Sequence, residues 1–453
     1  MTGAGRAAPP KSSVAQTRRA VWNTLRGSSG NLVEWYDVYV YTVFVTYFEQ
    51  QFFDPADKNS TVYVYAIFAV TFVMRPVGSW FFGRLADRRG RRAALTASVT
   101  LMAGCSFVIA LVPGRESIGV AAAVILVLCR LVQGFATGGE YGTSATYMSE
   151  AATRERRGFF SSFQYVTLVG GHVLAQLTLL ILQWLLTPAQ LHDFGWRIAF
   201  AIGGVAAIVV FWLRRSMDES LSAEQLAAVR NGQDTSSGSM AELFGSFWRP
   251  LVLCFLITMG GTIAFYVYSV NAPAMVKSAY AGHGMTATWI NLAGLVFLMM
   301  IQPIGGLISD RVGRKPMLVF FGVGGVFYTY FLITFLPTIG TALGSLAMVC
   351  AGYVIITGYT SINALVKSEL FPSHVRALGV GFGYAMANSI FGGTAPMLYE
   401  AAKEAHRVPW FIAYVTAVIG TSLIVYVCCL RNKAPTFLDR EQGAAFDESK
   451  GTE

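Results

Sequence analysis

The chain has 453 residues, of which 54% are hydrophobic and only 13% are charged, and its formal net charge at pH 7 is +9. A composition this apolar excludes an ordinary water-soluble globular protein and places the chain among integral membrane proteins. The positive charge does not by itself point to nucleic acid, because lysines and arginines in a membrane protein first report its topology.

Twelve apolar segments follow one another along the chain, each near or above the ~20 residues that cross the hydrocarbon core of a bilayer. We predict membrane-spanning helices over residues 29–52, 62–83, 93–112, 118–149, 158–186, 196–214, 247–277, 287–308, 317–336, 342–369, 375–400 and 408–430. The fold class is therefore all-α and integral to the membrane. The predicted organisation is a tail (1–28), a six-helix bundle (29–214), a polar linker with a short helix around 219–230 (215–246), a second six-helix bundle (247–430) and a disordered tail (431–453).

Most of the 34 lysines and arginines lie in the two tails and in the loops on the same side of the predicted membrane. The positive-inside rule then predicts a multi-pass protein with both termini in the cytoplasm and no nucleic-acid partner. The six cysteines lie in apolar runs without the spacing of a metal site or a disulfide framework, so we expect neither.

The first two predicted helices carry ionisable residues at membrane depth. Glu34 and Asp37 are three residues apart and share one helical face, where either can carry a proton. Arg75 lies about nine residues, or ~13 Å, from the cytoplasmic end of the second helix. It either binds an anionic substrate or pairs with one of the two acids of the first helix.

Two loop signatures occur once in each half. GRLADRRGRR (83–92) matches GLISDRVGRK (306–315), and the seven-residue spacing from Glu150 to Arg157 recurs from Glu369 to Arg376. This repeat predicts two related six-helix halves. We expect Asp87 to pair with Arg91 or with Arg157; alternatively, the arginines only set the topology. Because one surface ion pair is worth ~0–1 kcal/mol, a cytoplasmic gate needs a network, which we assign to Asp87, Arg91, Glu150, Arg157, Asp310, Arg314, Glu369 and Arg376.

The fourth helix has one polar face and one face of small residues. Its polar stripe includes Arg130, Gln133, Glu140 and Tyr141, while glycines at 134, 138 and 142 suit close helix contact. A charge at mid-membrane costs ~2.5–3.5 kcal/mol unless a partner offsets it. We predict that Arg130 is the main clamp for a substrate carboxylate, with Arg75 as second clamp, and that Glu140 is a further candidate for the coupled proton.

The remaining substrate-site candidates are uncharged or weakly basic. His172 in the fifth helix titrates near neutral pH in water and is either functional or a hydrogen-bonded core residue. The C-terminal half supplies tyrosines and amides as neutral donors; the tyrosines serve equally as packing residues. Lys367 is read as a topology charge. The predicted neutral contacts to substrate are Gln133, Tyr141, Gln164, His172, Tyr266, Tyr268 and Asn363.

The loop GRLADRRGRR resembles a loop motif of the major facilitator superfamily. GNLVEWYDVYVY (30–41), FVMRPVGSWFFGRLAD (72–87), GGEYGTSATYMSE (138–150) and ELFPSHVRALGVGFGYAMANSIFGG (369–393) resemble the metabolite:proton symporter family within it, in particular its α-ketoglutarate carriers. The resemblance implies proton-coupled uptake of a small dicarboxylate such as α-ketoglutarate across a bacterial inner membrane by alternating access. The proton gradient drives such transport without a cofactor, and we expect a monomer.

Several other functions stay open at this point. The substrate is alternatively citrate, a C4-dicarboxylate, shikimate or an aromatic acid. An osmolyte carrier would be expected to bring a long C-terminal heptad helix, and a transceptor a signalling domain; neither pattern is present in the sequence. An enzyme is disfavoured because no nucleophile–base set is apparent, and the missing GxxxxGK[ST] motif argues against ATP-driven transport.

Overall fold

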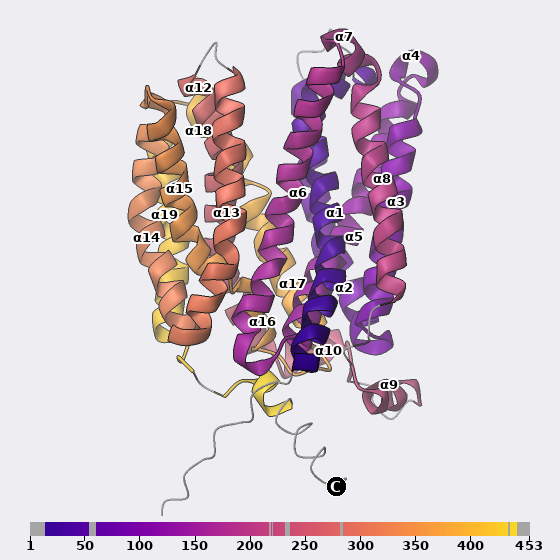
Figure 1. The fold of residues 1–453 in the computed structure, drawn as a ribbon, viewed down its shortest axis with the longest axis vertical. Helices are drawn as coiled ribbons and strands as arrows, with labels where there is room; N and C mark the ends of the chain where they lie inside the picture. Colours follow the sequence, from indigo (N-terminus) through magenta and orange to yellow (C-terminus); the bar gives the residue numbers. More distant parts are fainter. Residues whose placement is uncertain are drawn as a thin grey trace, which may run out of the picture.

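The computed structural model describes residues 14–53, 60–216, 219, 221–231, 236–280, 284–433 and 435–441. Its helices form two groups that stand side by side (Figure 1). The N-terminal group consists of α1 (Val14–Phe52), α2 (Ser60–Arg89), α3 (Arg91–Leu111), α5 (Ala121–Ala151), α6 (Arg157–Leu185) and α8 (Trp196–Arg215). The short α4 (Arg115–Ile118) and α7 (Pro188–Gln190) connect its helices.

The C-terminal group also contains six rods, three of which are interrupted. Its continuous helices are α13 (Gly284–Val312), α14 (Arg314–Phe335) and α19 (Val408–Cys428). The interrupted rods are α11 (Trp248–Tyr266) with α12 (Ala272–Ala279), α15 (Ala342–Thr360) with α16 (Asn363–Ser368), and α17 (Arg376–Ala387) with α18 (Ala395–Glu404). The prediction of an all-α membrane fold with six helices in each half is confirmed.

Nine helical segments within the described part of the chain are long and apolar enough to cross a membrane. The other three predicted spans correspond to α1, to α2 and to the α17–α18 rod. The region between the groups contains α9 (Ala223–Arg230), where a short helix was predicted, and α10 (Met240–Gly245).

Two of the interrupted rods contain a turn of π-helix. These turns are η3 (Val267–Asn271) and η5 (Asn388–Gly392), and a proline follows each of them, Pro273 in α12 and Pro396 in α18. Proline removes a backbone donor and clashes with the preceding turn, so the helix widens before it. Because π-helical turns occur frequently at functional sites, both rods are candidates for lining the transport path.

Glycines set the close helix contacts that the sequence predicted for the fourth span. A Cβ on Gly138 would lie 2.1 Å from the backbone oxygen of Arg75 in α2. A Cβ on Gly142 would lie 2.5 Å from the Cα of Gly381 in α17, across the boundary between the groups. The small-residue face of α5 therefore packs both within its own group and against the other group.

The two repeated loops share one backbone geometry. Gly90 and Gly313 have φ angles of 98° and 100°, a region that L-residues rarely adopt, and each is the cap before α3 or α14. The glycine conserved between the two copies of the motif thus lets α2 turn directly into α3 and α13 into α14.

Both of these turns lie at the end of the bundle where residues 435–441 are found, the lower end in Figure 1. We call it the tail end. The expectation that everything after residue 431 is disordered is wrong for residues 437–441, which form a helical turn with Leu438 buried. Two acids of this turn meet buried arginines, and these contacts offset the entropy of ordering the segment.

Candidate functional site

At the tail end, Asp87 of the N-terminal loop motif contacts the C-terminal group of helices. It forms an ion pair with Arg91, four residues on, and this settles the sequence alternatives in favour of Arg91. Its two carboxylate oxygens also accept hydrogen bonds from the backbone amides of Ala377 and Leu378, over 3.2 and 3.0 Å. Asp87 therefore caps the first turn of α17, where a negative charge is stabilised.

Glu150 bridges arginines of the two groups. Its Oε1 accepts hydrogen bonds from Arg91 over 3.1 Å and from Arg376 over 2.8 Å. Both guanidinium groups are fully buried, and the Glu150 side chain is only 9% exposed. This shared carboxylate is shielded from water, so its loss would leave two buried positive charges short of a partner.

The loop motif of the C-terminal half makes the corresponding contacts with the N-terminal group of helices. Asp310 pairs with Arg314 over 3.0 Å and accepts hydrogen bonds from the amides of Gly158 and Phe159 at the start of α6, over 2.8 and 3.0 Å. Glu369 stands 3.7 Å from Arg314. Burial raises the pKa of Glu369, and the nearby arginines offset this only in part. Each half thus caps a helix of the other, but the Glu369 contact is looser than that of Glu150.

The helical turn after residue 435 joins the same network. Asp439 pairs with Arg157 over 2.8 Å, and Glu441 pairs with Arg376 over 2.5 Å and accepts from the Ser373 amide. Partial burial raises the pKa of Asp439, but the backbone hydrogen bond from Thr436 and the Arg157 charge lower it more, so the net pKa shift is downward. One short segment therefore contacts an arginine in each group.

Arg130 lies inside the N-terminal group. Its guanidinium is buried, stands 3.6 Å from Asp37 and covers the Tyr41 ring at 4.2 Å from the ring centre. Gln133 accepts from Arg130 over 3.0 Å and donates to Asp37 over 2.7 Å, and Ser106 donates to Asp37 as well. Two nitrogens of Arg130, Nε and Nη2, have no hydrogen-bond partner. Arg130 therefore has a carboxylate partner within its own group of helices.

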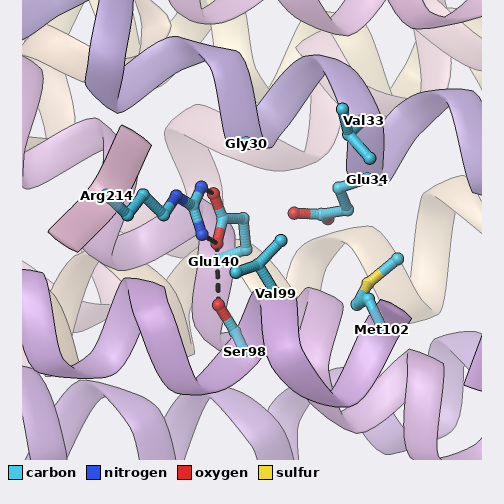
Figure 2. A pocket seen from close by; sticks show the side chains of 8 residues that line it. All are labelled: Gly30, Val33, Glu34, Ser98, Val99, Met102, Glu140 and Arg214. Carbon is cyan, nitrogen blue, oxygen red and sulfur yellow. Dashed lines mark hydrogen bonds and ion pairs between the residues drawn. The ribbon is translucent and has the colours of Figure 1, made fainter. Parts of the chain in front are cut away.

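Glu140 is held by Arg214, which lies in the last turn of α8 and in the sequence resembles a topology charge. Arg214 of α8 pairs with both carboxylate oxygens of Glu140, and Ser98 donates to Glu140 over 2.8 Å. Glu34 faces the same small cavity, which has room for about one water molecule (Figure 2). Its Oε2 is buried without a hydrogen-bond partner. The two acids thus share a cavity, but only Glu140 is neutralised there.

Arg75 is a buried cation at the boundary between the groups. Its guanidinium lies 4.0 Å from the ring centre of Phe72 and 5.4 Å from that of Trp35. Its charge acts on Tyr266 and Tyr384 of the C-terminal group. Its Nε and Nη2 have no hydrogen-bond partner, and no acid within the described ranges forms an ion pair with it. The predicted alternative, a structural ion pair with an acid of the first helix, is not what the structure has.

Neutral polar groups without partners surround Arg75. The Tyr266 hydroxyl is close enough to Arg75 and Asn388 for electrostatic interaction, yet it makes no hydrogen bond of normal geometry. Both polar side-chain atoms of Asn388, in η5, are also unpartnered. His172 stacks on Tyr39 with 3.8 Å between ring centres, and its Nδ1 and the Tyr39 hydroxyl lack partners. Buried donors and acceptors are rarely left unmet, so this cluster fits a polar ligand.

A second polar cluster joins the groups next to Gly142. The Tyr141 ring stacks on Tyr384 with 3.4 Å between ring centres. Its hydroxyl accepts hydrogen bonds from Asn363 over 2.8 Å and from Lys367 over 3.0 Å. Lys367 is fully buried, so its role as a topology charge at the membrane surface is not supported.

Two predicted substrate contacts have their partners inside one group. Gln164 bonds to Ser144 and Asn31, which ties α6 to α5 and α1. Tyr268 bonds to Thr329 of α14 over 3.0 Å. These hydrogen bonds account for their burial without a ligand.

Sequence reasoning did not find the contacts of Arg214, Lys367 or the acids at 439 and 441, whereas Asn388 is among the polar residues of the C-terminal half that the sequence predicts to face the cavity. For Asn388 a signal existed, because GGTAP places a proline shortly after an amide within an apolar run, as NAP does at Asn271. For the two cations no local signal existed, because their contacts lie on other helices.

Known proteins resemble this chain in sequence and in fold. A family model described as the Major Facilitator Superfamily matches residues 27–396. The chain is 40% identical over 419 residues to the alpha-ketoglutarate permease of Escherichia coli K12, covering 92% of this chain and 95% of that protein. It is 29% identical to a citrate-proton symporter of Klebsiella pneumoniae, covering 84% and 85%. The fold matches the proton:xylose symporter XylE bound to 6-bromo-6-deoxy-D-glucose with a TM-score of 0.78 at 18% identity, covering 94% and 99%.

Proposed function

We propose, from the premise that this chain belongs to the Major Facilitator Superfamily, that it is a proton-coupled symporter of a small dicarboxylate, with α-ketoglutarate as first candidate. The protein is a multi-pass membrane transporter and not an enzyme. The similarity to a permease for α-ketoglutarate supports this substrate. The site supports it independently.

The observation that carries the proposal is the unsatisfied guanidinium of Arg75. A buried cation without an acidic partner is costly, and the cost falls when an anion arrives. A guanidinium grips a carboxylate with two parallel hydrogen bonds. Tyr266 and Asn388 then meet the neighbouring keto and carboxylate oxygens from the other group of helices. Substrate would thus bind where both halves contribute.

This proposal makes Arg75, and not Arg130, the main contact for the substrate carboxylate. Arg130 was expected to be the main clamp, but in this structure Asp37 already neutralises it. We propose that Arg130 and Asp37 form a supporting pair and that Arg75 makes the first contact. The contact between Arg130 and substrate remains a prediction for a conformation in which its pair has opened.

The proton is assigned to the acid that lacks a counter-charge. Asp37 and Glu140 each form an ion pair with an arginine, whereas Glu34 forms none within the described part of the chain. The charge of Arg75 acts on Glu34. When a substrate carboxylate neutralises Arg75, protonation of Glu34 becomes more favourable, and linkage requires that the proton in turn favours substrate binding. Asp37 is the alternative carrier, released when its pair with Arg130 opens.

Transport then follows by alternating access between two six-helix units, residues 29–214 and 247–430, joined by the linker 215–246. We propose that the tail end faces the cytoplasm of a bacterial cell, as the placement of basic residues favours. The caps of Asp87 and Asp310 and the bridge of Glu150 would close that end while substrate enters from outside. They would separate to release it inside.

Uptake by purified protein in liposomes tests the function. Radiolabelled α-ketoglutarate is expected to accumulate when the outside is acidic, and much less without a pH gradient. A panel of unlabelled citrate, succinate, shikimate and proline as competitors ranks the other substrates. Accumulation of a neutral or zwitterionic solute, with no uptake of any organic acid, would contradict the proposal.

Substitutions test the site. Arg75→Gln is expected to raise the KM for α-ketoglutarate by tenfold or more, because a charge-assisted bidentate contact is lost. Arg75→Lys is expected to recover only part of the affinity, since a point charge does not reproduce the planar fork. A KM for Arg75→Gln within twofold of the unsubstituted protein would refute Arg75 as the contact. Glu34→Gln is expected to retain exchange but lose gradient-driven accumulation.

A further inference from the structure

Lys367 is a buried cation that none of the roles assigned above explains. It lies in α16, directly after the interruption at residues 361–362 that separates α15 from α16. Its side chain is fully buried, and no acid in the described part of the chain pairs with it. Discontinuous helices at membrane depth commonly form ion or substrate sites in transporters.

Three tyrosine rings, and not a carboxylate, lie next to the Lys367 ammonium. The Lys367 ammonium lies 4.4 Å from the ring centre of Tyr384, 4.9 Å from that of Tyr141 and 5.9 Å from that of Tyr359. It also donates a hydrogen bond to the Tyr141 hydroxyl over 3.0 Å. Ring faces attract a cation but do not neutralise its charge. The site therefore stabilises a positive charge while leaving it available to an anion.

Tyr384 connects this cation to Arg75. Its ring is 4.4 Å from the Lys367 ammonium, and the charge of Arg75 acts on its hydroxyl. Two buried cations therefore act on one tyrosine, Arg75 from the N-terminal group and Lys367 from the C-terminal group. A dicarboxylate carries two negative charges separated by a short carbon chain, whereas a monocarboxylate would neutralise only one of the two cations.

We propose that Lys367 binds the second carboxylate of the substrate and so selects dicarboxylates over monocarboxylates. This inference rests on the proposed function, in which Arg75 binds the first carboxylate. A carboxylate that reaches Lys367 takes over the bond that the ammonium now makes to Tyr141. That bond joins the two groups of helices, so a dicarboxylate loosens the closed tail end. A monocarboxylate held by Arg75 alone leaves the bond in place.

The test compares two ligands that share one end. α-Ketoglutarate and 2-oxopentanoate have the same chain and the same keto acid group, but only the first has a carboxylate at the far end. Lys367→Met is expected to raise the KM for α-ketoglutarate by about tenfold to a hundredfold, which corresponds to one lost charge-assisted contact. Inhibition by 2-oxopentanoate is expected to change by less than about twofold, since no contact to it is removed.

Two further variants serve as controls for a general loss of structure. Methionine fills the same space without the buried charge, so Lys367→Met is expected to fold, and its thermal unfolding in detergent checks this. Lys367→Arg restores a cation and is expected to recover affinity for α-ketoglutarate relative to Lys367→Met. Lys315→Gln removes a lysine that donates to the backbone oxygen of Val427 at the tail end, and it controls for the loss of positive charge elsewhere.

The outcomes separate this inference from the function on which it rests. If the unsubstituted protein takes up no organic acid, the proposed function fails. If it takes up α-ketoglutarate and Lys367→Met changes the affinities for both ligands equally, or changes neither, the selection role is refuted. A loss confined to α-ketoglutarate and recovered by Lys367→Arg supports it.

Discussion

Glu150 and Glu369 occupy equivalent places in the two halves and offer a matched pair of substitutions. Glu150 accepts hydrogen bonds from Arg91 and Arg376 over 3.1 and 2.8 Å, whereas the contact of Glu369 with Arg314 is 3.7 Å long. Replacing either glutamate by glutamine removes one negative charge and keeps the shape. The structure predicts very different effects on closure of the tail end.

The magnitudes follow from these contacts. Each hydrogen bond between Glu150 and an arginine is worth ~1.5–3 kcal/mol, and a neutral amide keeps about half of that. Because the Glu150 side chain is only 9% exposed, water replaces little of the loss. Glu150→Gln is therefore expected to cost about 2–3 kcal/mol, a shift of about 30- to 150-fold toward opening. Glu369→Gln is expected to cost less, about 1 kcal/mol, because its carboxylate stands 3.7 Å from Arg314, which is too far for a strong hydrogen bond.

Cys254 provides the assay. Its side chain is fully buried, and the charge of Lys367 acts on it, so it lies near the second polar cluster. In a variant that keeps only this cysteine, a maleimide that does not cross membranes is applied to inside-out vesicles. Glu150→Gln is expected to accelerate labelling in proportion to the open fraction, and Glu369→Gln by less than about fivefold. Equal acceleration by both, or none by Glu150→Gln, would refute the reasoning.

Three other changes test the packing and electrostatics. Gly142→Ala is expected to abolish closure of the tail end and so to accelerate labelling of Cys254, because its Cβ would clash with the backbone of α17. As a control, Gly104→Ala places its Cβ in open space and is expected to leave the labelling rate unchanged. The contact between Asp439 and Arg157 should persist below about pH 4, the ordinary pKa of an aspartate, because the pKa of Asp439 is lowered and the carboxylate stays charged there; titration of the Asp439 side-chain carbon by NMR checks this. Glu140→Gln, which breaks a buried ion pair, should lower stability by about 3–5 kcal/mol in thermal unfolding.

Most helices and the acids of the tail end were predictable because their signals are local. Hydropathy predicts most membrane spans within a few residues of their helices, but α1 begins at Val14, well before the predicted residue 29, because its first turns are polar, and α2 continues to Arg89 beyond the predicted residue 83. The aspartates of the repeated loops stand at helix ends, where a carboxylate is commonly used. Their partners were predicted less well: Asp87 does pair with Arg91, but its contact with the start of α17 depends on a segment nearly three hundred residues away.

The deep charges were predictable as a set but not as partners. The sequence shows that Arg75, Arg130 and Glu140 lie within spans, yet hydropathy carries no information about which neighbouring helix each one faces. Arg214 illustrates the problem, because it follows the last apolar residues of its span and resembles a topology charge. Its long side chain reaches Glu140 of α5. Lys367 was misread for the same reason.

The contacts that residues 437–441 make with buried arginines can form only after all the membrane spans have been synthesised. These residues come only a few positions after α19, which ends at Cys428. During synthesis they are still inside the ribosome when the final span is being inserted, while the earlier helices have already begun to fold. Arg157 and Arg376 therefore lack the contacts of Asp439 and Glu441 until translation has passed residue 441. The new chain therefore passes through a stage in which all its spans have been inserted but the tail end still lacks the contacts of Asp439 and Glu441.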